Sequence, residues 1–225
     1  MTQRNIRWGV LRFLFGMLYR NRTLYWLAST IPFAGQWRVW QRLVLPRLRG
    51  RDVLELGCGI GTLLADMAES GYVCTGIDRS SQMVEAARRE LRRRHVPESA
   101  ATVQRADASA LPFTGGSFDT VVSTFPTEYI LDSRVIAEVV RVLRPGGRMV
   151  VVPGAALTPA SPVLAPLLLI QRTVYGRQSD APSRRAGPEP KSSLAALLET
   201  VGLRAREERV TGPFWVAHVI TAEKV

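Results

Sequence analysis

The chain contains little cysteine and no uninterrupted apolar run long enough to cross a bilayer. Only two of its 225 residues are cysteines, Cys58 and Cys74, and they do not form a C-x-x-C pair. This excludes a disulfide framework or a zinc site of paired cysteines, and we expect both thiols to be small buried fillers in a reducing cytoplasm. The sequence also lacks a cluster of metal-ligating residues, so no metal is expected.

Acidic residues are missing from the first 51 residues, which hold ten arginines. The chain carries a net charge of +11, with 30 basic and 19 acidic residues in all, so the remainder is nearly neutral at 20 basic and 19 acidic. The same segment holds nine of the 17 aromatic residues. Arginines interleaved with aromatic rings suit an anionic membrane surface or a nucleic acid.

Periodicity favours the membrane among these partners. Apolar residues recur at three-to-four spacing and predict an amphipathic helix: Ile6, Val10, Phe13, Leu14, Met17 and Leu18. Arginines at 7, 12 and 20 interrupt any transmembrane span, and Arg12 splits the apolar core that a signal peptide needs. A second helix is predicted from Gln36 to about Leu45, ended by Pro46. We expect residues 1–49 to form a helical arm that contacts an anionic membrane, and the alternative is a lid over a pocket.

The most informative motif lies at residues 53–61, Val-Leu-Glu-Leu-Gly-Cys-Gly-Ile-Gly. A short buried strand runs into three glycines, and a helix is predicted to begin at Thr62. Glycines in such a turn accept a positive φ and let backbone N–H groups approach a ligand without a Cβ in the way. A dinucleotide fingerprint would place its third glycine one residue later. The turn therefore predicts a cofactor cradle of another kind.

Further matches follow in order along the chain. A second strand, residues 72–77, ends at Asp78, about 20 residues after the first glycine, where an acid can bind a ribose diol. A short strand over 101–106 runs into Asp107. Together with E-x-G-x-G-x-G at Glu55 to Gly61, the series over residues 50–153 resembles the class I S-adenosylmethionine (SAM)-dependent methyltransferases.

The resemblance implies an α/β fold, a Rossmann-like doubly wound sheet of seven strands in the order 3-2-1-4-5-7-6 with strand 7 antiparallel. It implies SAM as the cofactor, with Asp78 on the ribose, Met83 over the adenine and Asp107 on the adenine amino group. The full set of cofactor-binding residues expected from it is Glu55, Gly57, Cys58, Gly59, Gly61, Asp78, Arg79, Met83, Asp107, Ala108 and Ser123.

The rest of the chain predicts a methyltransferase domain over residues 50–225. Expected elements are a helix over 80–94, a strand over 118–124, a helix over 132–143, a strand over 148–152, a helix over 192–201 and an antiparallel pair over 203–210 and 214–222. A proline-rich insertion is expected over 154–190. The arginines that crowd the helix end at 88–94 predict a solvated face, with a phosphate site as the alternative.

The segment after the fourth strand is where the resemblance places acceptor-facing residues. Within it, Glu128 or Tyr129 is the predicted catalytic residue, either stabilising an ammonium group or taking its proton, and the alternative is that both begin a surface helix. Tyr19 and Tyr25 are alternative pocket residues if the arm folds over the site. The segment does not match the N/D-P-P-Y/F signature of nucleobase amino methyltransferases, which disfavours RNA and DNA.

The pattern is similar to the phospholipid N-methyltransferase and quinone C-methyltransferase group. The leading hypothesis is a peripheral enzyme at the inner face of the membrane that methylates a lipid or other lipophilic acceptor, with the amine of phosphatidylethanolamine as one candidate. A soluble methyltransferase for a small natural product, with the arm as a lid, is the second hypothesis. An RNA methyltransferase or a non-catalytic RNA- or SAM-binding protein is the third.

Overall fold

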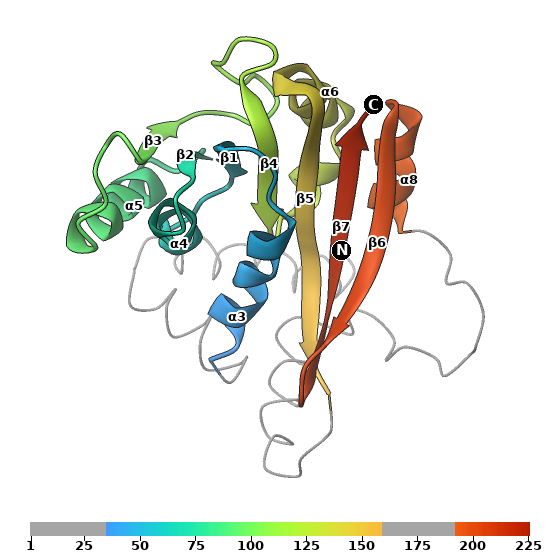
Figure 1. Cartoon of the computed structure of the whole chain (residues 1–225), viewed down its shortest axis with the longest axis horizontal. Coiled ribbons are helices and arrows are strands. Elements are labelled where there is room, and N and C mark those ends of the chain that lie inside the picture. The colour runs from blue at the N-terminus through green and yellow to red at the C-terminus, as the bar shows by residue number, and fades with distance from the viewer. Residues whose placement is uncertain (1–34, 159–191) are drawn as a thin grey trace, which may run out of the picture.

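The computed structural model describes residues 35–158 and 192–225. Seven strands form one sheet in the order β3-β2-β1-β4-β5-β7-β6 (Figure 1). The strands are β1 (Asp52–Leu56), β2 (Val73–Asp78), β3 (Ala101–Arg105), β4 (Phe118–Thr124), β5 (Leu143–Leu157), β6 (Leu203–Thr211) and β7 (Trp215–Lys224). The helices are α3 (Trp37–Gln41), η1 (Arg42–Arg47), α4 (Thr62–Glu69), α5 (Ser81–Arg93), η2 (Glu128–Leu131), α6 (Ser133–Val142) and α8 (Ser193–Thr200).

The first five strands are parallel, and β7 is antiparallel to both β5 and β6. The predicted sheet order and the antiparallel last strand are therefore confirmed. β1 and β4 lie in the middle of the sheet and are buried on both faces, which explains their near-continuous apolar sequences. The order reverses between β1 and β4, so a crevice is expected at the carboxyl ends of these two strands.

Helices cover both faces of the sheet (Figure 1). One face packs against α4, α5 and η1 through a core that contains Leu64, Leu91 and Val44. The other packs against α6 and α8 through a core that contains Ile136 and Leu198. The helices α5, α6 and α8 each begin at a side chain that accepts a backbone N–H bond: Ser80, Asp132 and Ser192.

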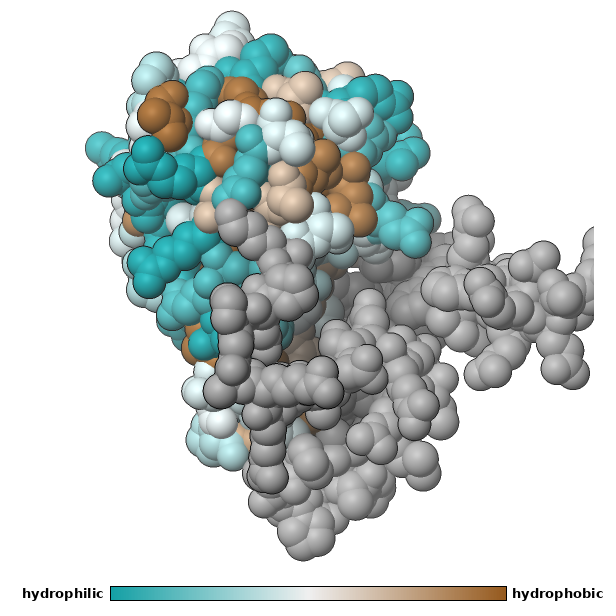
Figure 2. All heavy atoms as spheres, turned by 90° about the vertical axis from the view of Figure 1, so that its right-hand side faces the viewer, coloured by the Kyte–Doolittle hydropathy of each residue, from teal (hydrophilic) through white to brown (hydrophobic). Residues whose placement is uncertain are grey.

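The outer edge of the sheet is β6, whose exposed residues are mostly charged. Figure 2 faces this edge of the molecule and shows hydrophilic residues predominating over it, with separate hydrophobic patches. Charged side chains on an edge strand discourage pairing with another chain. None of the helices in the described part of the chain is long and apolar enough to span a membrane.

Two predicted elements differ from the structure. The strand expected over 148–152 extends from Leu143 to Leu157, because a register shift between Val151 and Gly154 accommodates Pro153 and pairing with β7 then resumes. The first four residues of the expected insertion therefore belong to β5. The helix expected over 36–45 is α-helical only to Gln41 and continues as the 3₁₀ helix η1, which contains Pro46.

The predicted amphipathic helix near the N-terminus, with Tyr19 and Tyr25, lies outside the described residues. So does most of the proline-rich insertion.

Candidate active site

The glycine turn leaves the carboxyl end of β1 and leads into α4. Gly57 has a φ of +69° and Gly59 a φ of +53°, which favour glycine at both positions. The turn is closed by the Gly61 N–H bond to the Cys58 carbonyl oxygen at 2.9 Å, and joined to β2 by the Cys58 N–H bond to the Ile77 carbonyl oxygen at 2.9 Å. The predicted cradle of bare backbone is therefore present.

Close packing behind the turn explains why positions 61 and 76 are occupied by glycine. A Cβ on Gly61 would lie 2.8 Å from the Cβ of Ala87 in α5. A Cβ on Gly76 of β2 would lie 2.8 Å from Leu64 and 3.0 Å from the sulfur of Cys58. Burial raises the pKa of the Cys58 thiol well above its usual value, so this side chain is a neutral filler rather than a nucleophile.

Asp78 ends β2 beside the turn. One carboxylate oxygen accepts the Gly59 N–H at 3.1 Å, and the other accepts the Ser80 N–H at 2.8 Å. These bonds hold the glycine turn against the start of α5. A carboxylate oxygen accepts more than one hydrogen bond, so the bonds are compatible with the predicted contact to a ribose.

The predicted adenine residues gather at the ends of β2 and β3. The Arg79 guanidinium lies 3.4 Å from the Asp107 carboxylate. Hydrogen bonds from the Ser109 N–H and hydroxyl lower the pKa of Asp107, and Arg79 adds to the effect. Met83 at the start of α5 and Ala108 are both buried. This end of the site thus offers the Asp107 carboxylate as an acceptor for an amino group.

Glu55 is buried within the sheet, opposite Gly76 of β2 and Val122 of β4. Its side chain is 2% exposed, and its Oε2 atom has no hydrogen-bond partner among the described residues. Burial, together with the nearby negative charges of Asp78 and Asp66, raises the pKa of Glu55 to about 8. The side chain is therefore mostly a neutral carboxylic acid at neutral pH.

The segment after β4 separates the two predicted catalytic residues. The Tyr129 hydroxyl donates to the Leu56 carbonyl oxygen at 3.2 Å and lies 2.9 Å from the Ser123 hydroxyl, whereas Glu128 is exposed at the start of η2. Burial raises the pKa of Tyr129 to about 12, which disfavours the predicted role as a base at neutral pH. A catalytic role for either residue stays a prediction.

An aromatic cluster lies beyond the carboxyl end of β4. Trp37 of α3 stacks on Phe125 with ring centroids 4.1 Å apart, and Trp40 packs edge-on against Trp215 of β7 at 6.3 Å. Phe125 has a φ of +50°, a genuine outlier for a bulky residue, and such residues cluster at functional sites. Leu157 completes the cluster.

The cluster includes functional candidates that the sequence analysis missed. Its members come from four distant segments and share no motif. The only local signal was the aromatic-rich composition around Trp37 and Trp40.

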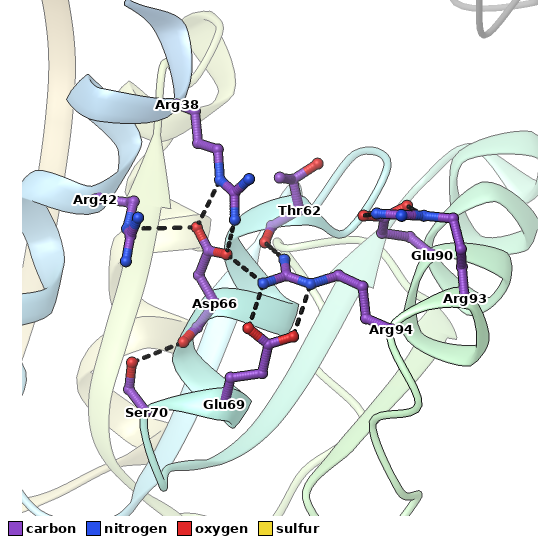
Figure 3. A network of polar contacts seen from close by, with 9 residues as sticks. All are labelled: Arg38, Arg42, Thr62, Asp66, Glu69, Ser70, Glu90, Arg93 and Arg94. Carbon is purple, nitrogen blue, oxygen red and sulfur yellow. Dashed lines mark hydrogen bonds and ion pairs between the residues drawn. The ribbon is translucent and has the colours of Figure 1, made fainter.

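Ionic contacts attach α3 and η1 to the cofactor-binding half of the sheet (Figure 3). The buried Asp66 carboxylate of α4 accepts two bonds from Arg38, at 2.6 and 3.2 Å, and lies 3.6 Å from Arg42. Arg94, at the end of α5, contacts the same carboxylate at 2.7 Å and also pairs with Glu69. The expectation that Arg94 belongs to a solvated face is therefore wrong, because two carboxylates of α4 hold this arginine, which is 12% exposed.

The doubly wound sheet, the bare glycine turn and the carboxylates at the ends of β2 and β3 define the class: a SAM-dependent methyltransferase. The bare backbone at Gly57 and the acids Asp78 and Asp107 fit a cofactor with a ribose, an adenine and a sulfonium cation. A protein-family model described as a methyltransferase domain matches residues 54–151 of this chain.

Comparisons with curated proteins agree with this class. The chain is 32% identical over 213 residues to a demethylmenaquinone methyltransferase of Mycolicibacterium gilvum, covering 88% of this chain and 89% of the relative. It is 37% identical over 131 residues to one of Beutenbergia cavernae, where the match spans about half of the relative, 52%. The chain belongs to the same methyltransferase family as these relatives.

Solved structures share the fold. A SAM-dependent methyltransferase from Aquifex aeolicus is 18% identical, with a TM-score of 0.56, and the match covers 82% of this chain and 89% of that one. The geranyl diphosphate C-methyltransferase of Streptomyces coelicolor is 15% identical, with a TM-score of 0.60 over 84% of this chain and 79% of that one.

Proposed function

We propose that this methyltransferase transfers the methyl group of SAM to a lipophilic acceptor with a planar ring, of the demethylmenaquinone type. The observation that carries the proposal is the aromatic cluster around the Trp37–Phe125 stack, at the end of the sheet where the acceptor must meet the cofactor. The relatives are named for demethylmenaquinone methyltransferase activity, which supports the same substrate class.

The residues divide the work between two ends of the crevice. SAM supplies the activated methyl group when bound, so the protein has to align the acceptor and keep water out. Gly57 to Gly61 and Asp78 hold the cofactor at the ends of β1 and β2. Phe125 and Trp37 offer flat apolar surface to a ring, which favours a stacked acceptor. A quinone ring is electron-poor, so the acceptor reacts as the reduced quinol.

Phosphatidylethanolamine and a water-soluble natural product are the competing acceptors. An ammonium head group would be best served by a carboxylate at the acceptor end, and Glu128, the acid of this segment, is exposed. Aromatic rings also bind ammonium groups, so the amine lipid remains the second candidate. A soluble acceptor would need no membrane contact from residues 1–49.

The test is transfer of labelled methyl from SAM by purified full-length protein. Three acceptors are compared in parallel: reduced demethylmenaquinone in detergent micelles, phosphatidylethanolamine in the same micelles, and a cytosolic small-molecule extract. Label in the quinone product supports the proposal. Label only in the amine lipid or the extract would overturn it, since the enzyme would then be active on another class.

The aromatic cluster is tested by Phe125→Ala in the same assay. We expect the KM for the quinol to rise roughly tenfold, because the stacking surface of the partly buried Phe125 ring is lost, while the affinity for SAM stays unchanged. Phe113→Ala is the matched control, since Phe113 pairs with Phe118 in a separate aromatic contact at 5.0 Å. An equal effect of both variants would argue against a stacking role for Phe125.

We also propose that the enzyme acts from the cytoplasmic, inner face of the membrane as a peripheral protein. Ten arginines and no acid in residues 1–51 support attraction to anionic lipid. The outer side of α3 adds Val39, 44% exposed, between Arg38 and Arg42.

A further inference from the structure

Three oxygen atoms converge beside the first glycine of the cofactor turn. They are the Leu56 carbonyl oxygen at the end of β1, the Ser123 hydroxyl in β4 and the Tyr129 hydroxyl in η2. Both hydroxyls lie 3.2 Å from the carbonyl oxygen and 2.9 Å from each other. A Cβ added to Gly57 would lie 3.1 Å from the Tyr129 oxygen. The cluster therefore faces the bare backbone over which the cofactor is held.

The cluster has more acceptor capacity than protons. Two hydroxyl groups bring one hydrogen each, whereas the hydroxyl and carbonyl oxygens each carry two lone pairs. Hydrogen bonds within the cluster use both hydrogens, so most of its lone pairs receive no hydrogen from within the cluster. Partial negative charge thus gathers at this point while no member is ionised, since the Tyr129 hydroxyl keeps its proton at neutral pH.

A neutral oxygen cluster distinguishes a cation from a neutral molecule of the same shape. SAM is a sulfonium cation whose methyl hydrogens carry partial positive charge, and its product, S-adenosylhomocysteine, is a neutral thioether. Oxygen atoms attract polarised C–H groups weakly but directionally. In a partly buried site the attraction to a full positive charge is stronger than in water.

We propose that Tyr129, supported by Ser123, is a positioning residue for the cofactor: its hydroxyl oxygen and the Leu56 carbonyl oxygen orient the sulfonium methyl and make the site prefer SAM to its product. Tyr129 acts toward the cofactor and takes no proton from the acceptor. The inference needs only the SAM site and holds for any acceptor.

The test measures binding of two ligands to the full-length protein without any acceptor. Titration calorimetry gives the Kd of SAM and of S-adenosylhomocysteine for the wild type and for Tyr129→Phe, which removes one oxygen atom. We expect SAM binding to weaken roughly fivefold to tenfold and product binding to change less than twofold, so the preference for SAM falls. Ser123→Ala should shift the ratio in the same direction by a smaller factor.

Tyr72→Phe is the matched control, because Tyr72 immediately precedes β2, at the opposite end of this strand from Asp78, and should leave both Kd values unchanged. If Tyr129→Phe weakened the binding of both ligands equally, the hydroxyl would have only a structural role, and the inference would be overturned. Unchanged affinity for both ligands would overturn it as well. If Tyr129→Phe does not fold, the ratio of the two Kd values in Ser123→Ala tests the inference instead.

Discussion

At the scale of single residues, Glu55 is an acidic side chain buried within the sheet. An acid in the middle of a parallel sheet is costly if charged, and the raised pKa of about 8 means that the folded protein keeps this proton at neutral pH. The unfolded chain releases the same proton near the ordinary value of 4.5. Because the folded state binds more protons between these values, the Glu55 contribution to stability falls as pH rises from 4.5 to 8.

Glu55→Gln tests this dependence. We expect the Glu55 side chain to lower the unfolding free energy of the wild type by about 4 kcal/mol as pH rises across this window. The amide of Glu55→Gln has nearly the same shape and cannot ionise, so this decrease should be absent from the variant. Urea unfolding at several pH values between 5 and 8 measures the difference between the two proteins. Glu98→Gln, at an exposed position, serves as the control. Parallel pH curves for wild type and Glu55→Gln would contradict the prediction.

The local geometry of the glycine turn was predictable, because the motif ties residue type to backbone conformation. The positive φ values at Gly57 and Gly59 and the backbone bonds accepted by Asp78 are local properties of a strand-to-helix turn. The partnership of Tyr129 with Leu56 was not predictable, because it joins residues far apart in the sequence whose hydroxyl and carbonyl meet only when β1 and β4 pair.

At the scale of elements, α4 joins the cofactor turn to the segment that precedes the sheet. Its Asp66 carboxylate is shared among Arg38 of α3, Arg42 of η1 and Arg94 at the end of α5. Burial opposes the charged form of Asp66, but hydrogen bonds from Arg38 and Arg94 outweigh it and lower the pKa of the carboxyl. One side chain thus holds three helical segments together.

Asp66→Asn should break this junction. Loss of the charge leaves Arg94 short of a partner in a largely buried position, and we expect unfolding free energy to fall by roughly 3 kcal/mol. The fluorescence of Trp37 and Trp40 should shift to the red as α3 loosens. Glu85→Gln is the control, because the exposed Glu85–Arg89 pair within α5 should contribute less than about 0.5 kcal/mol. A cost no larger than that of the control would show that Asp66 does not hold α3.

Predicted and observed element boundaries agree where an apolar run or a capping residue marks them, as at β4 and at the Ser80 cap of α5. They departed from it where tertiary pairing overrides a local stop signal. Pro153 reads as the end of a strand, yet β5 continues to Leu157 because β7 supplies a partner beyond the register shift. The one local sign of the ion pairs between α4 and the neighbouring helices was Asp66, an acid inside the apolar run of α4.

At the scale of the whole molecule, the positive charge and the catalytic sheet occupy different parts of the sequence. Residues 52–225 are nearly neutral, while the first 51 residues carry ten positive charges. The sheet order implied by the family resemblance is confirmed. The aromatic cluster lay beyond prediction, because Trp37, Phe125, Leu157 and Trp215 meet only through the complete sheet and the segment packed on it.

This asymmetry predicts binding to anionic membranes that weakens with salt. Each arginine near such a surface contributes about 1 kcal/mol, and the attraction is screened once the Debye length falls to roughly 4 Å near 0.5 M salt. Full-length protein should therefore float with vesicles containing phosphatidylglycerol at low salt, but float poorly at high salt or with phosphatidylcholine alone.

Val39→Glu separates a specific α3 contact from general attraction. Val39 is exposed between two arginines, so a carboxylate there should weaken flotation several-fold by both repulsion and lost apolar contact. Val225→Glu changes the charge equally at the C-terminal residue and should have little effect. Flotation that is equal on neutral and anionic vesicles, or absent from both, would contradict the proposed membrane contact. Residues 35–49 would then have only a packing role, which the burial of Trp40 and Val44 already shows.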